Sequence, residues 1–217
     1  NTEKLSYGRT TVLPTVLLQS NWASHELALA AFMKARNYPG KSQEDFIDWG
    51  IGSRGRIDIR ETTNMNGSMN YQWLTEDRSG VDVVVNAPDP STYGQFDING
   101  LANHTFDQLT TSLAGSYTNL NYRTDNQSYR NRNLFVATTR LGYIFSPGYT
   151  AFVQAEGNYR DYNNRAVQTQ VGNMAPPPTQ IACGAPTSIR DCPYQDSTGY
   201  RIVAGVSSQL TDLIAGE

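Results

Sequence analysis

The amino-acid sequence predicts an all-β protein, an antiparallel up-and-down transmembrane β-barrel. Segments in which apolar and polar residues alternate recur roughly every 20 residues, and each is about 11–16 residues long. Strands of soluble proteins usually have about 5–6 residues, whereas a tilted strand that crosses a membrane needs about 9–11. The connections between the segments alternate between short and long. Together, these three observations favour a membrane-spanning barrel.

The bulk composition does not separate such a barrel from a soluble protein. The 217 residues are 38% hydrophobic and carry a formal net charge of −3. No apolar run approaches the roughly 18 residues of a membrane helix. Only every second residue of a barrel strand faces lipid, so a spanning barrel resembles a soluble protein in bulk. The chain has no basic block to neutralise phosphates, which argues against nucleic acid as a partner.

Nine strands are expected from the period-2 alternation. The clearest is 46–61, where Ile47, Trp49, Ile51, Ile57 and Ile59 fall on one face and charged residues fall on the other. The nine expected ranges are 8–20, 25–38, 46–61, 65–78, 93–106, 109–122, 133–146, 150–163 and 198–211.

Three of these strands are less regular. The range 8–20 is apolar on both faces around Pro14, which suggests an edge strand or a bulge. The range 25–38 has an alanine-rich middle that helix propensity alone would assign to a helix. The range 109–122 alternates weakly, and we expect it to change face near Asn119.

The order of the connections predicts the orientation of the barrel. If the strands run up and down, all short turns lie at one end and all long loops at the other, as in outer-membrane barrels with periplasmic turns and extracellular loops. The short connections are 21–24, 62–64, 106–108, 146–149 and 211–213. The long connections are 39–45, 79–92, 123–132 and 164–197.

Aromatic residues near the strand ends are expected to form two girdles at the water–lipid boundaries. Packing of strand-end aromatics on their neighbours is the alternative interpretation. Trp22, Phe106, Phe145 and Tyr149 lie by the short turns, and Trp73, Tyr93, Tyr159 and Tyr200 lie toward the long loops.

The strand count predicts a barrel that this chain does not close alone. Bacterial single-chain barrels have an even number of strands, and an open sheet in lipid leaves two costly edges. We therefore expect a tenth strand beyond Glu217, further strands before Asn1, and a larger parent barrel of which 1–217 is a single incomplete domain. Closure by several copies is the alternative.

Several segments resemble a known family of outer-membrane proteins, the putative β-barrel porin 2 family. These are Asp-Trp-Gly at 48–50, Gly-Arg-Ile-Asp-Ile at 55–59, Ser-Pro-Gly-Tyr at 146–149 and Gly-Tyr-Arg-Ile-Val-Ala-Gly-Val at 199–206. The likeness extends in patches over nearly the whole chain, and its motifs mark turns and strand ends. The resemblance implies an outer-membrane barrel, often linked by context to surface polysaccharide, with no settled substrate. The cysteine-bearing insertion at 164–197 departs from the family pattern.

The two cysteines, Cys183 and Cys192, both lie in the long connection 164–197, which we expect to be extracellular. The oxidising exterior favours a disulfide between them, and two cysteines without a nearby histidine make a poor zinc site. Three consecutive prolines at 176–178 are expected to stiffen this loop. The loop either folds over the mouth as a constriction or forms an exposed surface feature.

Charged residues on the polar side of the strands are the candidate functional residues. A water-filled lumen whose charges select solutes is one interpretation, and a plugged barrel in which arginine–carboxylate pairs satisfy one another is the other. The arginines at 54, 56 and 60 would favour anions unless Asp48 and Asp58 neutralise them. The predicted lumen-facing residues are Asp48, Arg54, Arg56, Asp58, Arg60, Glu76, Asp97, Arg140, Glu156, Arg160 and Arg201.

The motifs argue against an enzyme and predict no catalytic residue, cofactor or metal site. The sequence has no G-x-S-x-G, Walker or HExxH motif. Its two histidines, His25 and His104, are both expected at short periplasmic turns, far from a loop-side active site.

Three functions follow as hypotheses. The leading one is a porin-like barrel in the bacterial outer membrane that passes or anchors small hydrophilic or saccharide solutes. The second is a structural or adhesive outer-membrane barrel with a plugged lumen, whose loops bind polysaccharide or a partner. The third is a soluble secreted β-sandwich. The expected partners are the outer-membrane bilayer, surface polysaccharide, other outer-membrane proteins and further copies of the chain.

Overall fold

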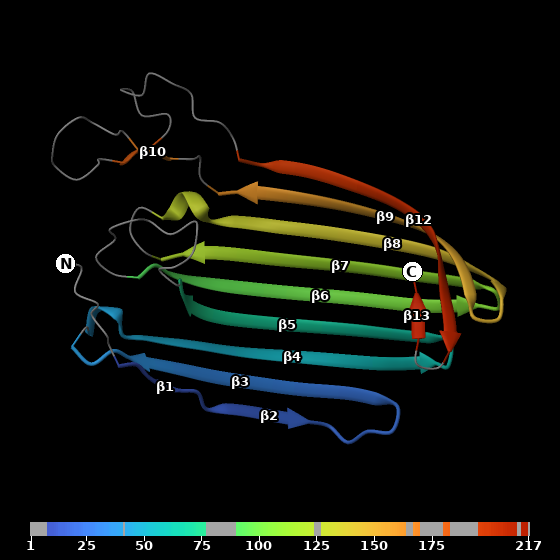
Figure 1. The fold of residues 1–217 in the computed structure, drawn as a ribbon, viewed down its shortest axis with the longest axis horizontal. Helices are drawn as coiled ribbons and strands as arrows, with labels where there is room; N and C mark the ends of the chain where they lie inside the picture. The colour runs from blue at the N-terminus through green and yellow to red at the C-terminus, as the bar shows by residue number, and fades with distance from the viewer. Residues whose placement is uncertain are drawn as a thin grey trace, which may run out of the picture.

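The computed structural model describes residues 8–40, 42–76, 90–123, 127–163, 167–169, 180–182, 195–211 and 214–216. Most of them form one antiparallel 11-stranded sheet in the order β1-β3-β4-β5-β6-β7-β8-β9-β12-β13, in which β2 also pairs with β3. Strands that follow one another in this sheet lie side by side, so the chain runs up and down (Figure 1). The predicted antiparallel up-and-down architecture is confirmed.

The sheet strands are β1 (Thr10–Val12), β2 (Thr15–Gln19), β3 (His25–Asn37), β4 (Phe46–Arg60), β5 (Thr63–Thr75), β6 (Thr92–Phe106), β7 (Leu109–Tyr122), β8 (Arg132–Ser146), β9 (Tyr149–Tyr162), β12 (Ser197–Thr211) and β13 (Ile214–Gly216). A separate hairpin joins β10 (Val167–Thr169) and β11 (Gln180–Ala182), inside the predicted loop 164–197. Two short 3-10 helices are η1 (Ser42–Glu44) and η2 (Ser128–Arg130). Neither they nor any other helix in the described ranges has the length and apolar character to cross a membrane.

The first predicted strand, 8–20, is divided at Pro14 into β1 and β2, and both parts pair with β3 at the edge of the sheet. The backbone N–H of Met33 donates to the carbonyl of Pro14 at 3.1 Å. An antiparallel pair of this kind normally has two hydrogen bonds, but proline has no N–H to donate to Met33, so the ladder is interrupted there. The alanine-rich segment 25–38 is the strand β3 and not a helix.

The expected tenth strand begins earlier than predicted. The sequence pattern put it beyond Glu217, whereas β13 at Ile214–Gly216 already pairs with the end of β12. In the described part of the chain, no backbone pairing joins β13 to β1 or β2, so the sheet is open.

The connections sort to two ends, as predicted. The turns that join β4 to β5, β6 to β7 and β8 to β9 have two residues each, and Figure 1 shows them at the end opposite the long loops. Asp107 has a φ of 48°, a left-handed conformation that aspartate tolerates in tight turns. Pro147 and Gly148 follow, in the last of these turns, the type II preference for proline before a residue with positive φ, which is 79° for Gly148. We call the two ends the short-turn end and the long-loop end.

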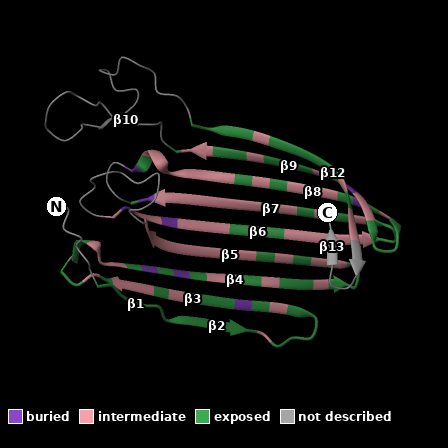
Figure 2. Cartoon of the chain, in the orientation of Figure 1, coloured by how far each residue is buried: buried purple, intermediate pink, exposed green. Residues whose placement is uncertain are grey.

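The sheet has one apolar and one polar face. Cross-strand pairing aligns Ile51 with Tyr71, and Tyr71 with Phe96, so apolar side chains meet across neighbouring strands. On this face Ile51 is 60% exposed and Leu113 is 56% exposed. Figure 2 shows exposed residues alternating with less exposed ones along the strands. Contiguous apolar surface of this extent needs an apolar medium to cover it.

The predicted change of face near Asn119 is wrong. The pairing of β7 with β6 and β8 shows no register shift, so Asn119 lies on the same face as Leu109 and Tyr117. Its side-chain amide donates to the side-chain oxygen of Asn133 at 2.8 Å. The ten-residue step from Leu109 to Asn119, at about 3.4 Å per residue and a tilt near 40°, spans about 25 Å, the height of a barrel's apolar band. The polar residues therefore mark where β7 leaves that band.

A β-sandwich requires a second sheet packed on the first. In the part of the chain that the structure describes, the eleven strands form one layer, and its buried apolar residues are Ala28, Tyr122 and Phe152. The soluble sandwich hypothesis does not fit a single sheet with so little enclosed core.

We predict that an arginine is tolerated on one face of β7 and not on the other. Leu113→Arg places a cation midway along the apolar face, and a loss of about 2–4 kcal/mol in unfolding free energy is expected in lipid vesicles. Ala114→Arg, one residue further and on the polar face, is the matched control with a loss below about 1 kcal/mol. Denaturant titration of both variants in vesicles measures the difference. Equal losses would contradict the assignment of the two faces.

Candidate functional site

The polar face carries the charged side chains that the sequence singled out. Ladder pairing fixes them there, because Arg56 pairs with Asn66, Asp58 with Asn64, and Glu156 with Arg201. Predicted residues that the strand alternation places on this face are Asp48, Arg54, Arg56, Asp58, Asp97, Arg140, Glu156, Arg160 and Arg201. Glu76 follows β5 directly at the long-loop end.

Arg60 is an exception. A register shift between Asp58 and Arg60 pairs Arg60 with Thr63 at the short turn, and Thr63 in turn pairs with His104. The hydroxyl of Thr63 lies 2.7 Å from Nδ1 of His104, at the short-turn end of the apolar face. The bulge breaks the alternation on which the prediction rested, so that pattern no longer assigns Arg60 to the polar face.

Most carboxylates of the polar face lie against a cation. Nη2 of Arg54 is 3.0 Å from Oε1 of Glu26, and Nη2 of Arg201 is 3.1 Å from Oε2 of Glu156. Nε of Arg56 is 2.8 Å from Oδ1 of Asp58. Arg54 and Arg56, expected to attract anions, each have a carboxylate partner.

Asp48 takes a structural role beside its charge. It is 4% exposed, and its Oδ1 accepts the backbone N–H of Thr75 at 2.7 Å. Its Oδ2 lies 3.7 Å from Nζ of Lys34 on the neighbouring strand. The carboxylate of Asp48 therefore ties β4 to the end of β5 and meets a lysine, not the arginines with which it was grouped from the sequence.

Three further predicted residues have different surroundings. Asp97 accepts from the hydroxyl of Thr118 at 2.7 Å and from the side-chain amide of Gln95 at 2.8 Å. The guanidinium of Arg140 lies 3.6 Å from the centroid of the Phe152 ring. Arg160 is exposed and makes no ion pair within the described ranges.

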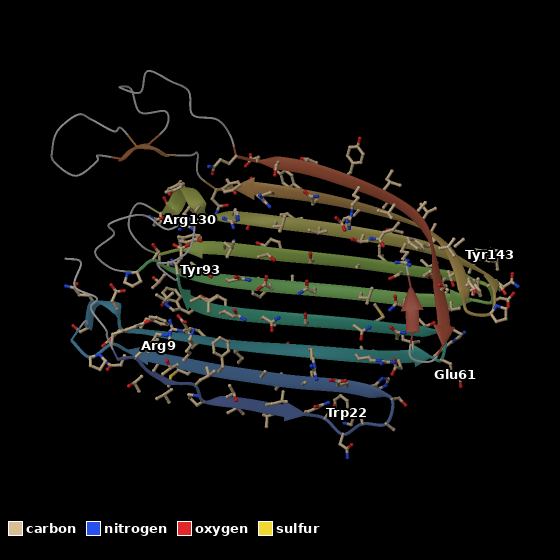
Figure 3. The ribbon with its side chains drawn as sticks, in the orientation of Figure 1. Arg9, Trp22, Glu61, Tyr93, Arg130 and Tyr143 are labelled. Carbon is tan, nitrogen blue, oxygen red and sulfur yellow. The ribbon has the colours of Figure 1, made fainter. Side chains whose placement is uncertain are left out.

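A cluster of side chains around Arg130 lies at the long-loop end of the polar face. Arg130 in η2 donates to both carboxylate oxygens of Glu76, from Nη2 at 2.5 Å and Nη1 at 2.8 Å. Its guanidinium stacks 4.2 Å from the Tyr122 ring, which in turn stacks on Tyr93. The hydrogen bonds that Arg130 donates to Glu76 raise the pKa of Arg130, and Arg130 also donates to the side-chain oxygen of Gln127. Arg130 therefore anchors the loop that carries η2 to Glu76 and Tyr122. Figure 3 labels Arg130 and Tyr93 at this end of the sheet.

Sequence reasoning missed part of this face. The alternation within 25–38 opposes Glu26, Lys34 and Arg36 to apolar residues, so that signal was present in the sequence. Arg130 lies in a loop, where no periodicity applies, and only the fold brings it to Glu76. The residues added by the structure are Glu26, Lys34, Arg36, Tyr93, Tyr122, Arg130 and Arg132.

The aromatic girdles are richer than predicted, with one correction. Toward the long loops, Phe96, Tyr117, Phe135 and Tyr159 form successive ring contacts on the apolar face, with centroids 4.8–6.4 Å apart. Tyr93, expected in this girdle, lies on the polar face instead. At the short-turn end, Trp22, Phe106, Tyr143, Phe145 and Tyr149 are all at least 40% exposed.

The remaining candidates involve the cysteines, the histidines and possible metals. Cys183 and Cys192 lie outside the described residues. His25 and His104 are at the short-turn end, and Nδ1 of His25 accepts the backbone N–H of Asp58 at 3.2 Å. Within the described ranges, no group of three or more His, Cys, Asp or Glu residues is placed to hold a metal ion.

Comparisons with known proteins agree with this fold. A family described as putative beta-barrel porin 2 matches residues 2–217. A solved structure of a protein named "Copper transporter OprC" has a TM-score of 0.55 and 13% sequence identity, over 95% of this chain and 36% of that chain. The chain thus spans about a third of the length of that structure, and at this identity the likeness shows the fold alone. No curated protein matches the chain.

We predict that the Glu76–Arg130 pair holds the η2 loop in place. Arg130→Met removes the cation beside Glu76, a side chain that is little exposed. The unpaired carboxylate then destabilises the local structure by about 1.5–3 kcal/mol. Hydrogen exchange at the amides of Arg130 and Asn131 should accelerate roughly ten- to hundredfold. Arg201→Met is the control: Arg201 is 62% exposed beside Glu156, so its loss costs less than about 1 kcal/mol. Comparable effects at both sites would refute the anchoring role.

Proposed function

Because the chain belongs to the putative beta-barrel porin 2 family, we propose that it is a porin-like barrel of the bacterial outer membrane that passes or anchors small hydrophilic solutes, saccharides among them. In this proposal the apolar face contacts the lipid and the polar face lines a water-filled lumen. The observation that carries it is the two-faced sheet: exposed isoleucine, leucine and aromatic side chains on one side, and hydrogen-bonding and charged side chains on the other.

The charge of the polar face supports the passage of polar solutes. The chain as a whole has a net charge of −3, yet cations outnumber anions among the described residues of this face. Lumen charges of one sign raise the local concentration of the opposite ion and set selectivity. The cations are Lys34, Arg36, Arg54, Arg56, Arg132, Arg140, Arg160 and Arg201, and the anions are Glu26, Asp48, Asp58, Asp97 and Glu156.

The copper in the name of the similar protein is a property of that protein. The described residues here have no grouping of ligands suited to a transition metal, and we do not extend copper to the proposed solute.

A second candidate is an adhesive or structural barrel with a blocked lumen, favoured by the anchored η2 loop and by the charge pairs of the polar face. Its surface loops would bind polysaccharide or a partner protein. Deletion of 164–197 should abolish such binding and leave the sheet folded, whereas a porin would retain its conductance.

The porin proposal predicts that the intact protein, reconstituted in planar bilayers, conducts ions. Liposomes that contain it should also swell in small polar solutes. Absence of both conductance and solute flux, in protein that shows heat-modifiable migration and is therefore folded, would overturn the proposal.

Neighbouring residues on opposite faces test which face lines the lumen. Arg160→Glu replaces an exposed cation of the polar face, so the reversal potential in a salt gradient should shift toward cation selectivity. Asp161→Lys, on the apolar face at the same height, changes the charge by two units of opposite sign and should leave the reversal potential unchanged. The test is most sensitive at low salt, where screening is weak. If the reversal potential shifted only in Asp161→Lys, the apolar face would line the lumen, which would contradict the proposal.

A further inference from the structure

The polar face contains a hollow midway between its two ends. The hollow has a volume of about 660 Å³ and spans six strands, β3 to β8. This volume falls within the range of small-molecule sites, about 300–1,000 Å³. Across the sheet, pairing aligns the side chains in two rows, one through Ser68, Asn99 and Ser116, and one through Asn66 and Thr138.

Short side chains form most of the lining of the hollow. In these two rows the residues from β5 to β8 are Asn66, Ser68, Asn99, Leu101, Ala114, Ser116, Val136 and Thr138, most of them short. The adjacent rows also carry mostly short residues, with Asn70, Asp97 and Thr118 toward the long loops and Asn64, Asn103 and Ser112 toward the short turns, and Arg140 ends the latter row. The short side chains of the two rows leave space over this part of the polar face.

The charges at the edge of the hollow cancel. Arg54 and Glu26 form an ion pair there, and Arg56 is paired with Asp58. Both contacts of Arg54 use Oε1 of Glu26, and the described residues supply no partner for Oε2. The edge therefore offers a carboxylate acceptor beside guanidinium donors, without net charge.

The remaining lining is suited to a ligand with hydroxyl groups and apolar carbon. Asn66, Ser68, Asn99, Ser116 and Thr138 each provide a hydrogen-bond donor and acceptor, as a hydroxyl group does. Leu101, Ala114 and Val136 form an apolar strip between them. A sugar ring likewise combines hydrogen-bonding and apolar surface, because it has hydroxyl groups around its rim and C–H bonds on its face.

We propose that this hollow is a binding subsite for a neutral oligosaccharide of two or three rings. The proposal rests on the proposed function, because it treats the polar face as the lumen, and it names the solute class that the wall recognises. The lining offers both donors and acceptors and its two arginines are paired with carboxylates. A neutral polyhydroxylated solute therefore satisfies the site, whereas an acidic sugar finds no unpaired cation in the lining.

The test measures binding separately from transport. Isothermal titration of maltotriose into the intact protein, purified in a detergent without a sugar headgroup, reports the subsite even if the lumen does not conduct. Maltotriose should bind, and trigalacturonate, its acidic counterpart in size, should bind at least about tenfold more weakly.

Two serines of β7 provide a matched pair of variants. Ser116→Leu places an isobutyl group within the hollow and removes a hydroxyl, so the dissociation constant for maltotriose should rise at least about tenfold. Ser112 lies on the same face of β7 outside the hollow, and Ser112→Leu should change the constant less than about twofold. Circular dichroism and heat-modifiable migration check that both variants fold.

Each other outcome has a defined meaning. No binding of maltotriose, stronger binding of trigalacturonate, or equal effects of the two serine variants would overturn the subsite. If maltotriose binds as expected but bilayers show no conductance, the subsite stands and the transport function fails. If the channel conducts but does not bind maltotriose, the reverse holds.

Discussion

The backbone ladder of the antiparallel sheet is the constraint on which the rest of this structure depends. With almost no enclosed core, the strands are held by hydrogen bonds between neighbours, and these bonds fix the register. Because successive residues of a strand point to opposite faces, a register slip of one residue would exchange the whole apolar set for the polar set. The ladder therefore determines both what contacts the surrounding medium and what lines the other face.

The same constraint explains which parts of the fold were predictable. Period-2 alternation located eight of the nine expected strands closely, because each strand has a uniform environment on either face. It failed where the chain departs from regular pairing. The bulge at Arg60 and the early start of β13 depend on local hydrogen bonding that a face pattern does not record. Pro14 did mark the edge strand in the sequence, and the strand is divided there. The predicted change of face near Asn119 was wrong for another reason. The strand continues beyond the apolar band with its faces unchanged, so a polar residue appears on the apolar side.

The candidate site divides in the same way. The alternation assigned Asp48, Arg54, Asp97 and Glu156 to one face, but it gave no partners for them. The partners depend on the cross-strand register: Glu26 reaches Arg54 from β3, and Lys34 reaches Asp48. Arg130 lies in a loop, so only the three-dimensional arrangement shows that it closes on Glu76. The sequence therefore shows which charged residues share a face, whereas the structure is needed to show which of them form ion pairs.

A row of glycines connects the curvature of the sheet to the hollow. Gly55, Gly67, Gly100 and Gly115 pair with one another in turn across β4 to β7, on the apolar face directly behind the hollow. A Cβ added at Gly100 would meet nothing within 4 Å, so close packing within the described residues does not require glycine there. Glycine weakens a strand but permits a tight bend in a barrel wall. The row leaves the apolar side of the wall without side chains across β4 to β7, directly behind the short side chains that line the hollow. The ladder assigns each of these positions to one face, so the hollow forms without any interruption of the backbone pairing between these strands.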